Sequence, residues 1–165
     1  LNAGNKSYKR GDLSKATNYY QKALEFDPQF YLAYFQLGVL QKKQGQSKAS
    51  IESLNKVLDI KPDHDKTWFT LGSVHETDGN NDLAIEHYSK AIEINPRDAN
   101  AYFNRGLNKA DLKDYYGAFS DYTEAIIIDA KDSIAYYLRG NARSNLNDYS
   151  GAIQDYSKAI KINPK

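Results

Sequence analysis

The side chains best suited to acid–base or metal chemistry are three histidines, His64, His75 and His87. His75 and His87 flank the polar segment 78–81, so two helices joined there could bring them together. A zinc site needs further ligands in matching geometry, and the adjacent Glu76 would point elsewhere on a helix. The run from His75 to Gly79 also lacks the second histidine of the HExxH zinc motif. We therefore expect solvated or half-buried histidines, with no metal and no cofactor.

Other catalytic constellations are missing from the sequence. Cysteine is absent, which excludes disulfides, thiolate ligands and a cysteine nucleophile. The glycine-rich motifs that cradle phosphates do not occur. Four carboxylates spread over two predicted helices are interpreted as a solvated face: Asp111, Asp114, Asp121 and Glu124. The chain is predicted not to be an enzyme.

Composition narrows the class of protein further. The 165 residues carry 22 Lys+Arg and 21 Asp+Glu, a formal charge of +1, so no nucleic-acid partner held by bulk charge is expected. The longest apolar run, 125–128, is far shorter than the ~18 residues that a membrane span needs. The compartment is left open, with the cytoplasm favoured. Because the chain starts at Leu1 and contains no Met, we expect it to be a piece of a longer protein.

The elements that position these residues follow from a period of 34 positions. Prolines stand at 28, 62, 96 and 164, glycines at 4, 38, 72, 106 and 140, and alanines at 16, 84, 118 and 152. Aromatic residues recur in two further sets at the same spacing: Tyr20, Tyr88, Tyr122 and Tyr156, and Tyr34, Trp68, Tyr102 and Tyr136. Internal self-similarity at such a period indicates a repeat architecture.

The pattern resembles the tetratricopeptide repeat (TPR) family, whose unit is a helix–turn–helix of this length. The resemblance covers the whole chain as five repeats, 1–30, 31–64, 65–98, 99–132 and 133–165. It departs at Ser50 and at Arg105 and Arg139, where the family usually has Leu, and these changes are expected to alter only local packing. The implied fold is an all-α, right-handed α-solenoid of antiparallel helices, with the first helix of each repeat on the concave side.

Helical periodicity supports this architecture independently. Trp68, Leu71 and Val74 share one face of a helix, and Gly72 and Ala84 are small enough to let two antiparallel helices approach closely. Gly79 and the Asp-Pro and Asn-Pro steps end helices. Ten helices are predicted, at 1–10, 13–27, 31–44, 47–61, 65–78, 81–95, 99–112, 115–129, 133–146 and 149–163.

The last predicted helix lacks the polar capping helix with which repeat arrays usually end. Its exposed face is expected to include Ala152, Tyr156 and Ala159. Either the protein continues beyond these residues, or copies stack end to end as a homo-oligomer.

A groove on the first helices is the candidate binding site that the resemblance implies. One slot of each repeat holds Phe35, Phe69, Phe103 and Tyr137, next to the packing aromatics. Neighbouring residues on a helix point about 100° apart, so one set faces the core and the other the groove. The alternative is that these rings pack on a neighbouring repeat. Polar groove positions include Lys9, Lys42, Lys43, Lys66, Asn100, Asn104 and Asn141.

Charge is uneven along the array. The five repeats carry +2, +2, −4, −2 and +3, a pattern that can orient a partner. The Lys/Asn/Arg pattern of the carboxylate-clamp branch of the family is incomplete, because Leu1 and Thr70 stand where it needs Lys and Arg. A chaperone-tail clamp is therefore not expected, although an acidic peptide could use the lysines.

The leading functional hypothesis is a non-enzymatic scaffold that binds a protein or peptide segment in the concave groove. One alternative is a structural module that self-assembles through its repeat ends or convex face. Another is a targeting arm of a larger enzyme.

Overall fold

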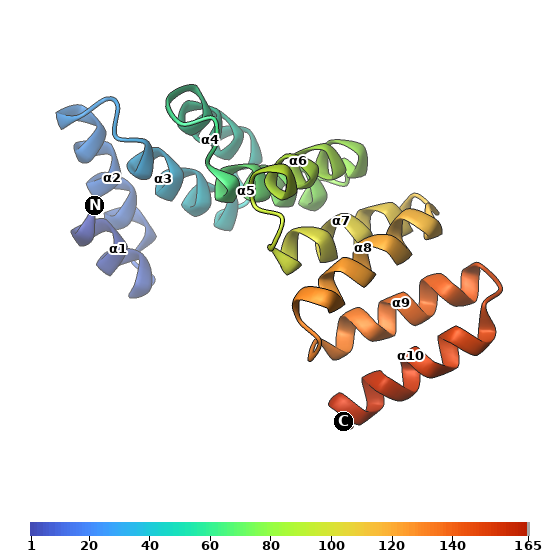
Figure 1. Ribbon diagram of the computed structural model, residues 1–165. Coiled ribbons are helices and arrows are strands. Elements are labelled where there is room, and N and C mark those ends of the chain that lie inside the picture. Colours follow the sequence, from blue (N-terminus) through green and yellow to red (C-terminus); the bar gives the residue numbers. More distant parts are fainter. Residues whose placement is uncertain (165) are drawn as a thin grey trace.

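The computed structural model describes residues 1–164 and contains, within them, ten α-helices and no strands. The helices form five antiparallel pairs that follow a curved course from α1 to α10 (Figure 1). Their bounds are α1 (Asn2–Lys9), α2 (Leu13–Phe26), α3 (Tyr31–Lys43), α4 (Ser47–Ile60), α5 (Asp65–Thr77), α6 (Asn81–Ile94), α7 (Ala99–Asp111), α8 (Tyr115–Ile128), α9 (Ser133–Asn145) and α10 (Tyr149–Ile162). The predicted all-α repeat solenoid is confirmed, and each helix end lies within one residue of its predicted position.

Helix ends follow from turn chemistry. Asp27, Lys61 and Asn95 each precede a proline and leave the helical region, with φ between −128° and −137°. Gly79 has a φ of +75°, a left-handed conformation that costs glycine nothing. Asp98 and Asp132 are N-caps: their side chains accept hydrogen bonds from backbone N–H groups in the first turns of α7 and α9.

The core runs along the whole array. Each first helix packs on the second helix of its own repeat, and from α3 onward also on the second helix of the preceding repeat. Buried clusters accordingly recur from end to end, for example Ala16 with Tyr20 near the start and Ala118 with Tyr122 near the end. This is the nearest-neighbour stacking expected of a solenoid.

Four of the five recurrent glycines lie against a tyrosine ring, and Gly38 lies against Leu54 instead. A Cβ on Gly72 would lie 2.8 Å from the ring of Tyr88, and one on Gly106 would lie 2.8 Å from the ring of Tyr122. The expected close approach at Gly72 is therefore filled by a tyrosine side chain of the second helix. In the third repeat Trp68 also ties helix to turn, since its Nε1–H donates to the carbonyl oxygen of Pro62 at 2.8 Å.

The exposed face of α10 differs from the predicted one. Ala152 and Ala159 are buried against α9, whereas Ile153 and Ile160 are both 65% exposed. Alanine in this slot therefore lies on the side of α10 that packs on α9. In the described residues no helix combines the length and the apolar character needed to cross a bilayer.

Candidate interaction groove

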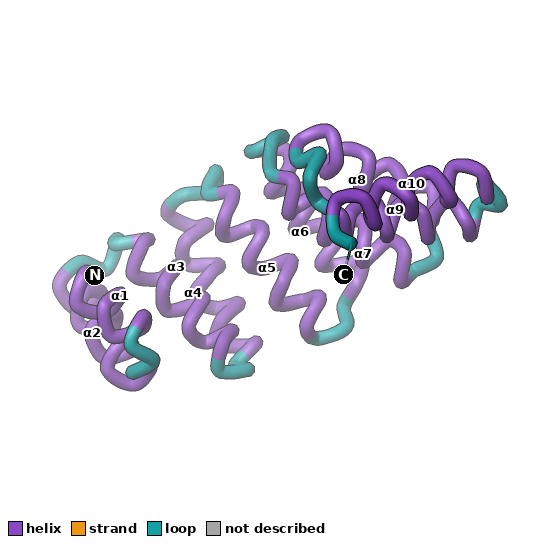
Figure 2. Tube along the Cα trace, turned by 90° about the horizontal axis from the view of Figure 1, so that it is seen from below, coloured by secondary structure: helices purple, strands orange, loops and turns teal. Residues whose placement is uncertain are grey.

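Side-chain contacts link the first helices of the first three repeats, α1, α3 and α5. The Nζ of Lys42 in α3 donates to the Oγ of Ser73 in α5 at 2.5 Å, and the Nζ of Lys43 lies 5.0 Å from the centre of the Tyr8 ring in α1. α3 and α5 run alongside each other (Figure 2). We call the surface formed by the first helices α1, α3, α5, α7 and α9 the groove. It holds the candidate residues predicted from the sequence.

The residues of the aromatic slot lie on the first helices and pack on the second helices. Phe69 packs on Tyr88, with ring centres 5.3 Å apart, and Phe103 packs on Tyr122 at 6.0 Å. Tyr137 is 53% exposed and lies 5.8 Å from Tyr156. Each of these three rings therefore packs on a tyrosine of the second helix of its own repeat, while Phe69 and Phe103 are half-buried and Tyr137 is exposed.

Tyrosine hydroxyls beneath the groove are bound by groove side chains, with one exception. The hydroxyl of Tyr88 donates to Oε2 of Glu76 at 2.5 Å. The equivalent hydroxyls of Tyr20 and Tyr156 donate to Oδ1 of Asn5 and Asn141, both at 2.9 Å. Burial raises the pKa of Tyr88, so its hydroxyl stays protonated and can act as a donor. Asn141, a predicted groove amide, therefore keeps its NH₂ group for a ligand.

The fourth repeat breaks this pattern. The hydroxyl of Tyr122 is buried and finds no hydrogen-bond partner within residues 1–164. The two positions that supply acceptors in the other repeats hold Leu107 and Ala110 here. Burial raises the pKa of Tyr122, with the charges of Asp111 and Asp121 adding to the effect. This stretch of the groove is apolar, which the sequence analysis did not detect.

The predicted groove lysines occupy different environments. Lys42 is half-buried, and burial lowers its pKa while the charge of Glu76 partly opposes that shift. Lys9, Lys43 and Lys66 are exposed. Lys42 thus joins two repeats, and the three exposed lysines remain accessible to a ligand. Of the other predicted amides, Asn100 is exposed, and the main-chain oxygen of Asn104 accepts a bond from Asn108.

Asp121 is not on a solvated face, contrary to the sequence-based interpretation. It is 2% exposed and accepts two hydrogen bonds from Arg105, at 2.9 and 2.6 Å, and an ion pair from Lys109 at 2.9 Å. Asp155 has the same arrangement with Arg139 and Arg143. The arginines in the Leu slot therefore introduce buried ion pairs and do more than alter local packing.

The third repeat places His75 and His87 where the fourth has Lys109 and Asp121. Their rings stack with centres 5.1 Å apart, and each Nδ1 is buried without a hydrogen-bond partner in the described residues. Burial and the neighbouring His75 lower the pKa of His87. Within residues 1–164 no group of three potential metal-binding side chains comes together. His64 lies apart from this pair and contacts Thr67 at 2.7 Å through Nδ1.

Two surface hollows lie at opposite ends of the array, and each includes a groove asparagine. The first, of about 470 Å³, is lined by Asn2, Asn5, Lys6, Lys9 and Arg10. The second, of about 430 Å³, is lined by Tyr137, Asn141, Tyr156, Ala159 and Ile160. The first hollow is basic, whereas the second is largely apolar.

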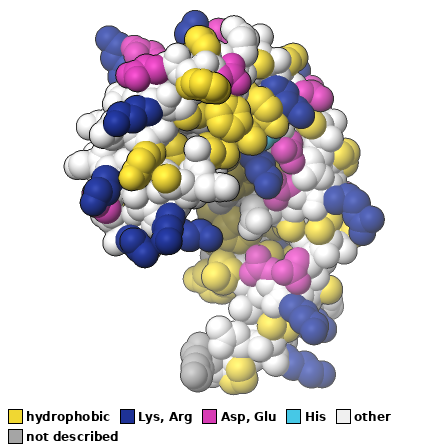
Figure 3. Space-filling view, turned by 90° about the vertical axis from the view of Figure 1, so that its left-hand side faces the viewer, with side chains coloured by type: hydrophobic (Ala, Val, Ile, Leu, Met, Phe, Trp, Pro, Cys, Tyr) yellow, Lys and Arg dark blue, Asp and Glu magenta, His cyan; other side chains and the backbone are white. Residues whose placement is uncertain are grey.

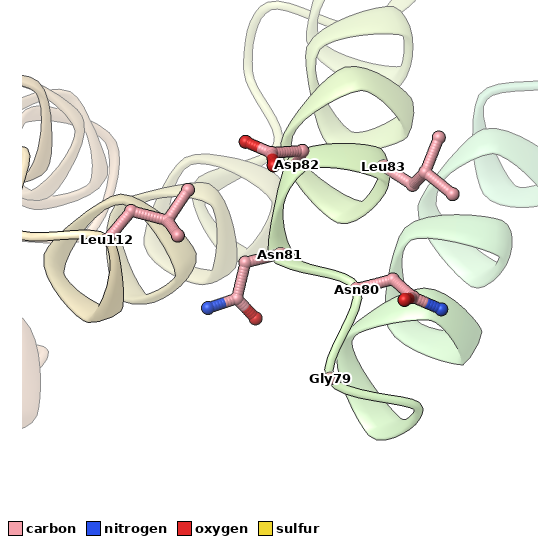
Figure 4. Close-up of a pocket in the computed structure, with 6 residues that line it drawn as sticks. All are labelled: Gly79, Asn80, Asn81, Asp82, Leu83 and Leu112. Atoms are coloured by element: carbon pink, nitrogen blue, oxygen red, sulfur yellow. The ribbon is translucent and has the colours of Figure 1, made fainter.

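A third hollow lies at the turn between α5 and α6 (Figure 4). It is lined by residues 79–83 and Leu112, and the side chain of Leu83 points away from Leu112. Its side chains do not converge on a common point, so no reactive constellation forms there.

Comparisons with known proteins agree with this geometry. Family models described as tetratricopeptide repeat match residues 31–64 and 133–165, and one described as TPR repeat matches 4–45 and 77–108. The chain in the crystal structure of MamA is 26% identical to this one. The match covers 99% of this chain and 96% of the MamA chain, with a TM-score of 0.92. YrrB, described as a TPR protein with an unusual peptide-binding site, is 25% identical over 98% of this chain and 84% of its own, with a TM-score of 0.84.

A further likeness extends the fold relationship alone. MamA from Desulfovibrio magneticus RS-1 is 18% identical over 99% of this chain and 92% of its own, with a TM-score of 0.90. Comparison with curated protein sequences gives no significant match.

Proposed function

Because the chain belongs to the tetratricopeptide repeat family, we propose that it is a non-enzymatic scaffold that holds a segment of a partner protein in its groove. The observation that carries the proposal is the aromatic slot that recurs on the first helices at Phe69, Phe103 and Tyr137. Half-exposed rings offer large apolar contact area at low conformational cost. Tyr137 and Asn141 stand together at one end, where a ring and a free amide group can engage a peptide side chain and main chain.

Capture of partners from lysate tests this proposal. The Tyr137→Ala variant removes a ring that is 53% exposed in the groove, and Tyr116→Ala removes one that is 75% exposed outside it. We expect the first substitution to reduce capture of a given partner several-fold and the second to leave it unchanged. Phe69→Ala with Phe103→Ala should abolish capture, provided that circular dichroism shows both variants folded. Equal capture by all variants would contradict groove binding.

Self-assembly through α10 is a second candidate function. Ile160 is 65% exposed, whereas Ile126, in the equivalent slot, is 7% exposed because α9 covers it. A bare helix-packing surface of this kind can pair with another helix. Ile160→Lys should then convert any concentration-dependent oligomer to a monomer in light scattering. A wild-type chain that stays monomeric at all concentrations would rule this function out.

A further inference from the structure

At one equivalent position of the repeat, the charge of the side chain changes from repeat to repeat along the groove. Lys9 and Lys43 occupy this slot in the first two repeats, Thr77 in the third and Asp111 in the fourth. Both lysines and the aspartate are exposed. A ligand lying along the groove therefore meets cations first and a carboxylate later, at structurally equivalent positions.

The basic end carries charge that the chain does not neutralise itself. Lys6, Lys9 and Arg10 line the first hollow together with two asparagines. None of the three, nor Lys43 or Lys66, forms an ion pair in the part of the chain that the structure describes. Exposed, unpaired cations of this kind attract an anionic ligand and speed its arrival.

The opposite end of the groove is apolar. Phe103, Leu107 and Ala110 are half-buried neighbours of Tyr122, and the second hollow continues this surface with Tyr137 and Ile160. The unpartnered hydroxyl of Tyr122 is a consequence, since no acceptor stands above it. In a space-filling view towards the first repeats, hydrophobic side chains lie in the depth of a hollow, and both basic and acidic side chains lie around its rim (Figure 3).

We propose that the groove takes one peptide segment with two unlike halves: an acidic half on α1, α3 and α5, and an apolar half on α7 and α9. This proposal rests on the proposed function and specifies the partner's chemistry. Charge complementarity selects the acidic half through Lys9, Lys43 and Lys66. Asp111 repels that half from the fourth repeat, so the segment binds in one register.

Synthetic peptides of fixed composition test the proposal by fluorescence anisotropy. The bipartite probe has twelve residues, with four Glu in one half and alternating Leu in the other, and is made with the acidic half first and with it last. Control peptides keep the same composition with Glu and Leu interspersed, or replace every Leu by Ser, or replace every Glu by Gln. The bipartite peptide in one of its two orders should bind at least tenfold more tightly than each control.

Two variants separate the halves of the site. Lys9→Ala/Lys43→Ala/Lys66→Ala should weaken bipartite binding about tenfold at low salt and flatten its salt dependence, since exposed charges act through screened attraction. Tyr137→Ala should weaken binding at every salt concentration. Lys48→Ala/Lys56→Ala/Lys90→Ala, which removes three exposed lysines on second helices, is the matched control and should change nothing.

The outcomes distinguish this inference from the function on which it rests. Loss of binding on Tyr137→Ala without any effect of the groove-lysine variant would leave groove binding standing and overturn the bipartite partner. Equal binding of the interspersed peptide would overturn it too. A single-stranded oligonucleotide could displace the bound peptide at a lower concentration than unlabelled peptide does. That result would identify nucleic acid, and not an acidic peptide, as the ligand. Failure of every peptide to bind the wild-type chain would overturn the bipartite partner, while capture of a lysate partner that depends on Tyr137 would still support groove binding.

Discussion

Replacing Asp121 by Asn should destabilise the array by about 3–5 kcal/mol, the range measured when one partner of a buried ion pair is removed. The Asp121 carboxylate is 2% exposed, and it compensates two cations, Arg105 and Lys109, through three contacts of 2.6 to 2.9 Å. Asn keeps the shape of the side chain but leaves both cations, whose side chains are only 17% and 20% exposed, without a charge partner. A surface change of the same chemistry, Glu52→Gln, should stay within about 0.5 kcal/mol.

The second repeat supplies a matched neutral design. Its residues at the three equivalent positions are Leu37, Gln41 and Ser53, and the Oγ of Ser53 donates to Oε1 of Gln41 at 2.7 Å. The triple variant Arg105→Leu/Lys109→Gln/Asp121→Ser transfers this set. It removes charge and partner together, so its stability should lie within about 1 kcal/mol of wild type or above it.

Urea unfolding followed by circular dichroism measures both variants at constant ionic strength. The single substitution should lower the unfolding midpoint markedly, and the triple variant should restore it. A single variant as stable as wild type would show that the carboxylate does not hold the two cations. A triple variant as unstable as the single one would show that the loss comes from disturbed packing.

Three further predictions concern other buried groups. Tyr122→Phe should stabilise the chain by about 1 kcal/mol because it removes an unpartnered hydroxyl, whereas Tyr88→Phe should destabilise it by a similar amount because it breaks the bond to Glu76; both follow from urea unfolding. The pKa of His87 is lowered from 6.5, so the folded chain binds fewer protons than the unfolded chain below that pH. Stability should therefore fall on acidification through this window, less steeply in His87→Gln, and identical pH profiles would refute the assignment. Gly106→Ala should cost about 1–3 kcal/mol in thermal unfolding, because its Cβ would meet the ring of Tyr122; an unchanged melting temperature would show that the ring moves freely.

The helices were predictable because backbone chemistry marks their ends. Proline after Asp27 and Asn95, and glycine at Gly79, act locally and need no knowledge of the fold. The period of 34 then determined which helices pair. At the C-terminal ends the remaining errors are of one residue, because the last predicted residue is the C-cap; that residue has left the helical region in α2 and α6, whereas in α1 and α5 it keeps a φ of −84°.

Burial of charge was not predictable from one helix face. Asp121 lies among polar neighbours in sequence, and only the packed structure shows that Arg105 reaches it from another helix. The available signal was periodic: Arg139 and Asp155 repeat the same pair one period later. Residues that recur together at the repeat spacing are candidates for contact, even when both are charged.

The groove residues were predictable by slot but not by environment. The family resemblance placed Lys42 and Lys43 on the same surface, yet Lys42 is half-buried on Ser73 and Lys43 lies over a tyrosine ring. The apolar positions Leu107 and Ala110 gave no signal, because each resembles an ordinary core residue of a helix. Their meaning depends on the acceptors that other repeats carry in the same slots.

Site-specific photocrosslinking tests the central claim, that partners bind in the groove, most directly. A photoreactive phenylalanine analogue is placed at Tyr137 or Phe69 in the groove, and at Phe26 or Ile127, both exposed on second helices. Groove binding predicts that one and the same partner is crosslinked from both groove positions and from neither of the others. Crosslinks from Phe26 or Ile127 alone would contradict the account and move the binding surface to the second helices.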